Sequence, residues 1–127
     1  YTQLEWVEVK PEKIKKNRSN DIILNLEAES IIQKTKKRDY LIALDRYGDQ
    51  YNSIDFAKWL EKLAINSNGW TCFIIGSPLG LSKKITSIAH SVLSLSPMTL
   101  THEMTRIILL EQIYRAFTIM RGEKYHK

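Results

Sequence analysis

The sequence predicts an α/β fold built on a parallel sheet with helices on both faces. Three observations lead to this fold class. Strand-like segments alternate with helix-like segments, several of the strand-like segments are apolar on both faces, and two of them end in small-residue loops that lead into helices. A length of 127 residues corresponds to one domain with a core of its own. We therefore expect residues 1–127 to form a single domain.

The first third of the chain is expected to contain a strand, a loop and a helix. Leu4–Val9 alternates apolar and polar residues, which predicts a short strand. Lys10–Asn20 contains proline, asparagine and serine, which are typical of a loop. Asn20 or Asp21 can cap a helix that runs to about Lys37, with its apolar positions on one face.

The middle of the chain predicts a strand, a turn and a helix. Tyr40–Leu44 is a continuous apolar run of strand length, and Asp45–Asn52, which contains Gly48, is expected to be a turn. Ser53 caps a helix that runs to about Asn66. The positions of this helix expected to face inward are Ile54, Phe56, Ala57, Leu60, Leu63 and Ala64.

The last part of the chain predicts two strands, each followed by a helix. Trp70–Ile75 is the first strand, and Ser82 caps a short helix that runs to about Ala89. Val92–Leu95 is the second strand, and a long helix covers about Thr101–Arg121. The apolar arc of the long helix is wider than one core contact needs. It predicts either a subunit interface or a helix deep in the core.

The composition argues against several classes of protein. The single cysteine, Cys72, allows no internal disulfide and is expected to be a core residue rather than a nucleophile. No apolar stretch reaches the ~20 residues that a membrane-spanning helix needs, so we expect no membrane contact. The three histidines, His90, His102 and His126, match no zinc-binding spacing, so we expect no metal. Asp45 is either a ligand contact at the end of a strand or a turn residue.

The chain carries a net charge of +5, and its basic residues are clustered. The clusters lie in segments 10–18, 34–38 and 121–127. Such clusters favour the phosphate backbone of nucleic acids and speed encounters with it. For each cluster, ordinary solvated surface charge is the alternative interpretation.

Two loops predict a ligand site. Gly76–Gly80 follows one predicted strand and Ser96–Thr101 follows the other. Ligands of open α/β folds bind at the carboxyl ends of parallel strands, and glycine lets the backbone approach a ligand closely. Gly76–Gly80 is neither a dinucleotide fingerprint nor a Walker loop, and alone it is equally consistent with a structural turn. Ser96–Thr99 alone is a weaker signal still, because Ser-Pro marks many turns. Together they indicate a binding site.

The motifs around these loops resemble a known family. Phe73–Ser82 is similar to the Ile-Gly-Gly-Pro-x-Gly-Leu-Ser loop of the large-subunit ribosomal RNA methyltransferase H family, which belongs to the SPOUT class of knotted methyltransferases. Ser94–His102 resembles its Ser-Leu-Ser-x-Met/Leu-Thr-x-x-His stretch. Arg106 and Glu111–Ala116 resemble its final helix, and Tyr125–Lys127 resembles its Tyr-His-Lys/Arg ending. The resemblance covers nearly the whole chain.

The chain departs from the family pattern at a few positions. Ser77 replaces the second glycine of the loop, and Leu79 replaces a polar or acidic residue. Because serine resists positive φ, we expect the loop to be reshaped. Glu123–Lys124 stands where the family has His-Pro. The family also begins with one more strand and helix before the segment at Leu4, so we expect this chain to lack them.

The resemblance implies a fold and an activity. It implies a SPOUT domain whose C-terminal part forms a trefoil knot, in a cytoplasmic homodimer with the final helix in the interface. It also implies methylation of N3 of a pseudouridine in a stem-loop of 23S rRNA within the ribosome, with S-adenosyl-L-methionine as cofactor. Two alternatives are a non-catalytic ribosomal RNA binder that keeps the fold, and a knotted methyltransferase acting on another RNA.

The resemblance further implies roles for individual residues. The residues expected to surround the cofactor are Leu44, Gly76, Ser77, Ser96, Pro97, Met98, Thr99, Leu100 and Thr101. His126 would accept the N3 proton, and Tyr125 would stack on the splayed base. The residues expected to bind RNA phosphates are Arg106, Arg115, Lys124 and Lys127. Independently of the resemblance, the spacing of four between Glu111 and Arg115 predicts an ion pair.

Overall fold

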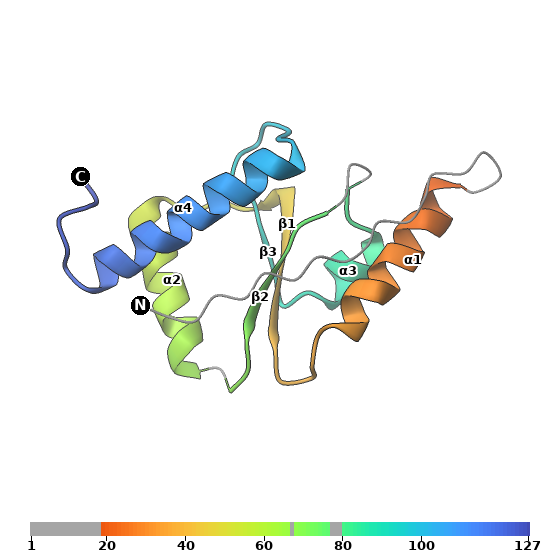
Figure 1. Ribbon diagram of the computed structural model, residues 1–127, viewed down its shortest axis with the longest axis horizontal. Coiled ribbons are helices and arrows are strands. Elements are labelled where there is room, and N and C mark those ends of the chain that lie inside the picture. The colour runs from red at the N-terminus through yellow and green to blue at the C-terminus, as the bar shows by residue number, and fades with distance from the viewer. Residues whose placement is uncertain (1–18, 67, 77–79) are drawn as a thin grey trace.

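Helices and strands alternate along the described part of the chain, as the sequence predicts (Figure 1). The computed structural model describes residues 19–66, 68–76 and 80–127. The helices are α1 (Asn20–Gln33), α2 (Ser53–Asn66), α3 (Lys83–Ile88) and α4 (His102–Met120). The strands are β1 (Tyr40–Asp49), β2 (Thr71–Ile74) and β3 (Ser91–Leu93). The predicted strand Leu4–Val9 lies outside the described residues.

The three strands form one parallel sheet with the order β2-β1-β3. β1 is therefore the central strand, and both of its edges are hydrogen-bonded. Ile42 lies opposite Phe73 of β2 and opposite Ser91 of β3. The parallel α/β sheet predicted from the apolar runs is confirmed.

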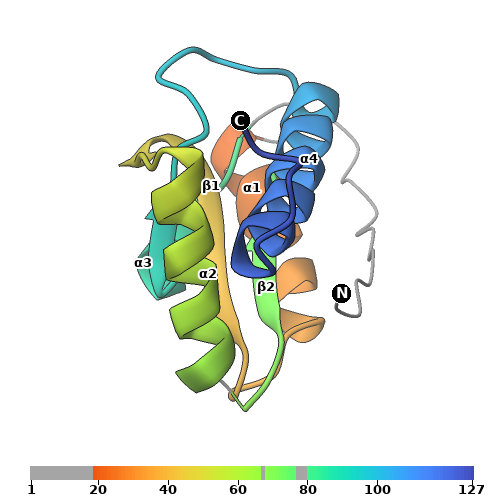
Figure 2. The same cartoon turned by 90° about the vertical axis from the view of Figure 1, so that its left-hand side faces the viewer.

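Helices cover both faces of this sheet, which confirms the predicted layers (Figures 1 and 2). Successive side chains of a strand point to opposite faces of the sheet, so β1 contributes residues to a hydrophobic core on each face. Ile42 packs with α2 and α4, and the buried residues of that cluster are Ile42, Phe56, Ala57, Leu60, Leu93, Leu109 and Ala116. Leu41 and Ala43 face α1 and α3, in a cluster completed by Ala28, Ile74 and Ile85.

The first helix differs from its prediction at both ends. Ser19, rather than Asn20 or Asp21, is the N-cap, because its Oγ accepts the Ile22 N–H at 3.2 Å. The helix ends at Gln33 instead of continuing to Lys37. The Asp39 N–H donates to the Lys36 carbonyl at 3.0 Å, so residues 36–39 form a separate turn instead of continuing the helix.

The predicted turn at Asp45–Asn52 is wrong, because β1 continues through Gly48 to Asp49. Gly48 serves a close approach instead of a turn: a Cβ there would lie 2.5 Å from the Val92 carbonyl oxygen of β3. Asp49 pairs with Leu93 and ends the strand. The extension brings the end of β1 alongside the loop that follows β3.

Two further details of the helices correct the predictions. Asn52 caps α2, since its Oδ1 accepts the Asp55 N–H at 2.8 Å, whereas the Ser53 hydroxyl donates to Gln112 Oε1 of α4 at 2.8 Å. Ile54 and Ala64 of α2 are exposed rather than inward-facing. The short helix is confirmed, with the Ser82 Oγ accepting the Ile85 N–H at 3.3 Å.

The long helix α4 exposes a stripe of large apolar side chains, so it is not deep in the core. The members of this stripe are Met104, Ile107, Leu110 and Tyr114. Its buried positions are Leu109, Ala116 and Thr118. Of the two interpretations that the sequence left open, a subunit interface agrees with this exposure. Among the described residues, no helix combines the length and apolar character that crossing a membrane requires.

A buried carboxylate joins the turn before β1 to the start of β2. Asp39 is 5% exposed; its Oδ2 accepts the Lys36 N–H at 2.8 Å and its Oδ1 accepts the Trp70 N–H at 3.0 Å. Burial alone would raise the pKa of this carboxyl, but the two N–H donors and the nearby charges of Arg38 and Lys36 lower the pKa below its ordinary value of 3.8. Asp39 is therefore ionised in the folded chain at neutral pH.

Replacing Asp39 with asparagine is expected to destabilise the fold. Asn offers one acceptor oxygen, so one backbone N–H loses its partner, at a cost of about 1–3 kcal/mol in the free energy of unfolding. The stabilisation by the ionised carboxylate is complete above the unfolded pKa of 3.8 and is lost as the pH falls through the lower folded pKa. Urea unfolding is measured at pH 7 and at steps down to pH 3. The difference in the free energy of unfolding between wild type and Asp39→Asn should narrow below about pH 4. The exposed Glu61→Gln is the control, and equal stability of wild type and Asp39→Asn at pH 7 would contradict the role.

Candidate active site

The candidate site lies at the carboxyl ends of the strands. β2 and β3 flank β1 and run in the same direction, so the loops after them leave the sheet at the same end (Figure 1). Leu44 of β1 lies between these exits and is half-buried against the core shared with α2 and α4. The structure therefore brings together Leu44 and the starts of both predicted loops.

The loop after β2 is closed at its base by two glycines. A Cβ on Gly76 would lie 2.6 Å from the Gly80 carbonyl carbon, so the two backbones touch. Gly80 has φ +88°, which favours glycine, and among the described residues no atom outside its chain neighbours lies within 4 Å of the position of a Cβ. Ser77, Pro78 and Leu79 lie outside the described residues, so the expected reshaping by Ser77 stays a prediction.

The loop after β3 is held by its own serines and by the end of β1. The Ser94 N–H donates to the Asp49 carbonyl at 2.8 Å, and the Ser94 hydroxyl donates to the Ser96 carbonyl at 2.9 Å. The Ser96 Oγ accepts the Met98 N–H at 3.0 Å. Gln50 adds a bond from its Nε2 to the Ser94 Oγ at 3.4 Å. The backbone path of this loop is thus fixed before any ligand binds.

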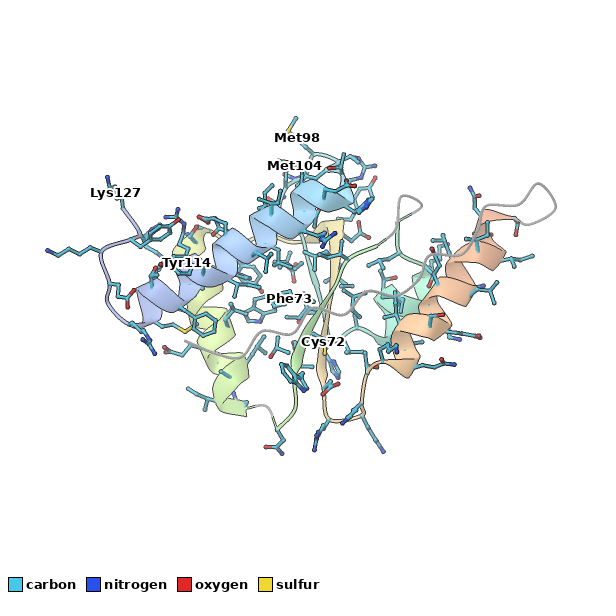
Figure 3. The ribbon with its side chains drawn as sticks, viewed as in Figure 1. Cys72, Phe73, Met98, Met104, Tyr114 and Lys127 are labelled. Atoms are coloured by element: carbon cyan, nitrogen blue, oxygen red, sulfur yellow. The ribbon has the colours of Figure 1, made fainter. Side chains whose placement is uncertain are left out.

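The remaining residues of this loop differ in exposure. Pro97, Met98 and Thr99 are exposed, with Met98 at the edge of the molecule (Figure 3), and Leu100 is half-buried. The Thr101 Oγ1 accepts the Met104 N–H at 3.2 Å, so Thr101 is the N-cap of α4. The residues of this loop are all uncharged, and the charged group that contacts it, Arg46, comes from β1.

Sequence reasoning missed Arg46 and Tyr47, which lie at this end of β1. Arg46 Nη1 donates to the Thr99 Oγ1 at 3.3 Å, and Nη2 donates to the Tyr47 hydroxyl at 2.6 Å. The Arg46 guanidinium also lies 4.6 Å from the centroid of the Tyr47 ring. The Asp45 Oδ1 accepts the Tyr47 N–H at 3.3 Å. Of the two roles that the sequence allowed, a ligand contact or a bond to the local backbone, the structure shows the second. No sequence signal marked these residues, because their neighbours are turn-forming types.

The C-terminal tail folds back onto the last turns of α4 through Arg115. Arg115 forms the predicted ion pair with Glu111, with Nη2 2.7 Å from Oε1, and this hydrogen-bonded carboxylate raises the pKa of the guanidinium. Arg115 Nη1 lies 3.1 Å from His126 Nδ1, and its guanidinium lies 4.8 Å from the Tyr125 ring centroid. Tyr125 also packs edge-on against Tyr114, with centroids 5.0 Å apart. The structure thus gathers Tyr125, His126 and Arg115.

The hydrogen bond from Arg115 determines which ring nitrogen of neutral His126 carries the proton. A guanidinium has no acceptor atom, so Nδ1 of the neutral imidazole must accept this hydrogen bond and Nε2 must carry the ring proton. In this conformation the lone pair on Nδ1 is already in use. His126 can accept a proton from a substrate only after Arg115 moves away from it.

The tail and the loops are not brought together within one chain. Arg115 lies thirteen positions after His102 on α4, and at about 1.5 Å per residue this is about 20 Å. Figure 1 shows the same separation, with the C-terminus at the far end of α4 from the loop that precedes it. Arg106 lies near the loop end of α4, and Lys124 and Lys127 are exposed at the tail end.

Cys72 is half-buried on β2, and burial, followed by the charge of Asp39, raises the pKa of its thiol to about 11. A thiol with this pKa is not a nucleophile at neutral pH, as the sequence predicts. Within the described ranges, no three side chains of His, Cys, Asp and Glu are grouped to hold a metal ion.

Comparison with known proteins assigns the family. Residues 1–126 match the sequence pattern of a family described as "Predicted SPOUT methyltransferase". The chain belongs to the SPOUT methyltransferase family. This membership confirms the resemblance drawn from the loop and tail motifs, and the parallel α/β sheet agrees with the SPOUT fold. The trefoil knot stays a prediction.

Relatives of this SPOUT chain share one name. Proteins called "Ribosomal RNA large subunit methyltransferase H" from Clostridioides difficile and Streptococcus uberis are 45% and 42% identical over 130 residues, which cover the whole chain and 82% of each relative. A protein of the same name from Bacteroides fragilis is 44% identical over 100 residues, or 79% of this chain. The match spans 64% of the length of that relative.

Proposed function

We propose that the chain is an S-adenosyl-L-methionine-dependent methyltransferase that methylates N3 of a pseudouridine in a stem-loop of 23S rRNA within the ribosome. The observation that carries the proposal is the meeting of two family loops at one end of the parallel sheet, on either side of β1. The names of the relatives support ribosomal RNA as the substrate. We also propose a cytoplasmic location, with the ribosomes.

The two loops have the chemistry that a bulky, largely neutral adenosyl group needs. We propose that it is bound by Leu44, Gly76, Ser77, Ser96, Pro97, Met98, Thr99, Leu100 and Thr101. The hydrogen-bonded backbone of Ser94–Met98 is preorganised. Backbone amides and carbonyls can recognise an adenine edge without charged side chains. The proposed fold completes this site by threading the C-terminal part of the chain through a trefoil knot.

The protein's task in this reaction is mainly positioning. The bound cofactor supplies a methyl group on an electrophilic sulfonium. The chain must hold the attacking nitrogen in line with that methyl group and remove the N3 proton. We assign proton acceptance to Nδ1 of His126 and stacking on the splayed base to Tyr125. The phosphates of the stem-loop are assigned to Arg106, Arg115, Lys124 and Lys127.

The assigned residues require a second copy of the chain. The tail lies about 20 Å along α4 from the loop of its own chain, which is too far for His126 to serve that loop. In a two-fold dimer, the tail of one copy can lie at the loops of the other. The exposed stripe of Met104, Ile107, Leu110 and Tyr114 gives α4 an apolar face for that contact. The proposed enzyme is therefore a homodimer.

A single comparison tests the proposed function. Labelled methyl incorporation from S-adenosyl-L-methionine is measured with intact ribosomes, isolated ribosomal RNA and transfer RNA, and the modified nucleoside is identified by mass spectrometry. We expect incorporation into 23S rRNA of intact ribosomes, at N3 of a pseudouridine. Incorporation only into transfer RNA would favour the enzyme acting on another RNA. Ribosome binding with neither incorporation nor calorimetric heat on adding the cofactor would favour the non-catalytic binder.

Replacing His126 with alanine should slow methyl transfer by about 10²–10⁴-fold, because general bases contribute that much, and leave cofactor binding unchanged. Single-turnover transfer and calorimetry measure the two effects. The control His126→Asn keeps an acceptor for Arg115 but provides no base, so it should be as slow as alanine. Unchanged transfer by the alanine variant, or full rescue by asparagine, would rule out His126 as the base.

Replacing Ile107 with glutamate should give a monomer that no longer transfers methyl groups. Ile107 is 62% exposed in the isolated chain and central in the apolar stripe, so an unpaired charge there would be desolvated in the dimer. Light scattering measures the mass, and methyl incorporation measures the activity. Ile65→Glu on α2, where the side chain is 76% exposed, is the matched control. A dimeric Ile107→Glu protein would contradict the proposed interface.

A further inference from the structure

A basic cluster that the proposed active site does not use lies in the turn between α1 and β1. Lys34, Lys36, Lys37 and Arg38 place four cations within five residues, and all four side chains are exposed. The turn lies at the amino ends of the strands, at the end of the sheet opposite the two loops (Figure 1). Both loops leave the sheet beside Leu44, which lies four residues after Tyr40, so at about 3.3 Å per residue the turn lies about 13 Å along β1 from the loops.

The backbone of this turn is held in one conformation. The Thr35 hydroxyl donates to the Ile32 carbonyl at 2.9 Å, and the Asp39 N–H donates to the Lys36 carbonyl at 3.0 Å. Buried Asp39 then fixes the turn to β2 through the N–H groups of Lys36 and Trp70. The cationic side chains therefore start from fixed positions, which lowers the entropy lost when they bind a ligand.

Among the described residues, neighbouring acids offset only part of the positive charge of this turn, since ionised Asp39 lies near Arg38 and Lys36 and the turn carries four cations. Among the ion pairs between described residues, none involves Lys34, Lys36, Lys37 or Arg38. Both oxygens of Asp39 are already bonded to backbone N–H groups. Glu29 of α1 pairs instead with Lys84 of α3, at 3.6 Å. The surface thus keeps a concentrated positive charge that suits a polyanion.

An aromatic side chain borders these cations. Trp70 is 39% exposed, and its carbonyl accepts the Tyr40 N–H at 2.9 Å, which holds it beside the turn. A Cβ on Gly69 would lie 2.8 Å from the Arg38 Cγ, so the stem of Arg38 runs directly over Gly69, next to Trp70. Cations and an indole on one surface are the combination that binds phosphates together with bases or sugars.

We propose that Lys34, Lys36, Lys37, Arg38 and Trp70, here called the basic turn, form a second RNA-binding surface for the ribosomal substrate. The inference rests on the proposed function and extends it. The cations bind the phosphate backbone of an RNA segment at the end of the sheet opposite the two loops, and Trp70 packs on an exposed base or sugar of that segment. Two linked contacts strengthen binding and fix the orientation of the chain on a large RNA.

The test compares two variants that lose the same charge. Lys36→Gln/Lys37→Gln removes two cations of the basic turn but keeps Arg38 and the backbone bonds to Asp39. Lys58→Gln/Lys83→Gln removes two exposed cations from α2 and α3. Binding to intact ribosomes is measured across a series of salt concentrations, and cofactor binding is measured by calorimetry.

The basic-turn variant should bind ribosomes several-fold to about tenfold more weakly at moderate salt, with the salt slope of log K reduced by between about one and two. Cofactor affinity should not change, and the control should resemble wild type. Trp70→Ala should also weaken ribosome binding by about fivefold or more, and Trp70→Phe should restore most of it, because stacking contributes about 1–3 kcal/mol per base.

Three outcomes would overturn the inference. The first is that the basic-turn variant binds ribosomes with the same affinity and the same salt slope of log K as the wild-type chain, while the wild-type chain binds and methylates ribosomes. This outcome would leave the proposed function intact. The second is an equal loss in the control variant, which shows a general charge effect. The third is binding of wild type to anionic phospholipid vesicles that the variant loses while its ribosome binding is unchanged. A wild-type chain that binds no ribosomes would refute the proposed function as well.

Discussion

The parallel pairing of β1 on both of its edges is the constraint on which the rest of the structure depends. β3 follows β2 in the sequence but lies on the opposite edge of β1, so the chain crosses the sheet through α3. The loops after β2 and β3 then leave on either side of the end of β1. Gly76 and Ser94 become neighbours of Leu44 only through this crossing. A sheet in sequence order would place the loops elsewhere.

Two polar anchors hold opposite ends of this pairing. At the amino end, Asp39 bonds the turn before β1 to the start of β2. At the carboxyl end, the Ser94 N–H bonds to the Asp49 carbonyl, so the extension of β1 fixes the loop after β3. Each anchor supports one proposed RNA-facing end of the molecule. The regular part of β1, from Tyr40 to Leu44, separates the basic turn from the loops.

Local patterns predicted most of the helices and strands, and they failed where distant partners decide the structure. Asp45–Asp49 contains turn-forming residues, yet it is a strand because Gly48 lets it approach Val92, some forty-four residues away in sequence. Both site loops could be predicted, since strand ends and glycines are local signals. The predicted helix over about Thr101–Arg121 already implied that the tail lies far from the loops. The contact of His126 with Arg115 could not be predicted, because it depends on how the chain turns back after the helix.

Arg115 connects the resting structure to the proposed chemistry. Its guanidinium contacts the Glu111 carboxylate, the His126 Nδ1 and the Tyr125 ring at the same time, through different atoms. An RNA phosphate that drew the guanidinium away from the tail would release the lone pair on His126 and the face of Tyr125 together. In the proposed mechanism, the base and the stacking ring therefore become available only when RNA is bound. Such coupling would keep a bound methyl donor from reacting before the correct substrate arrives.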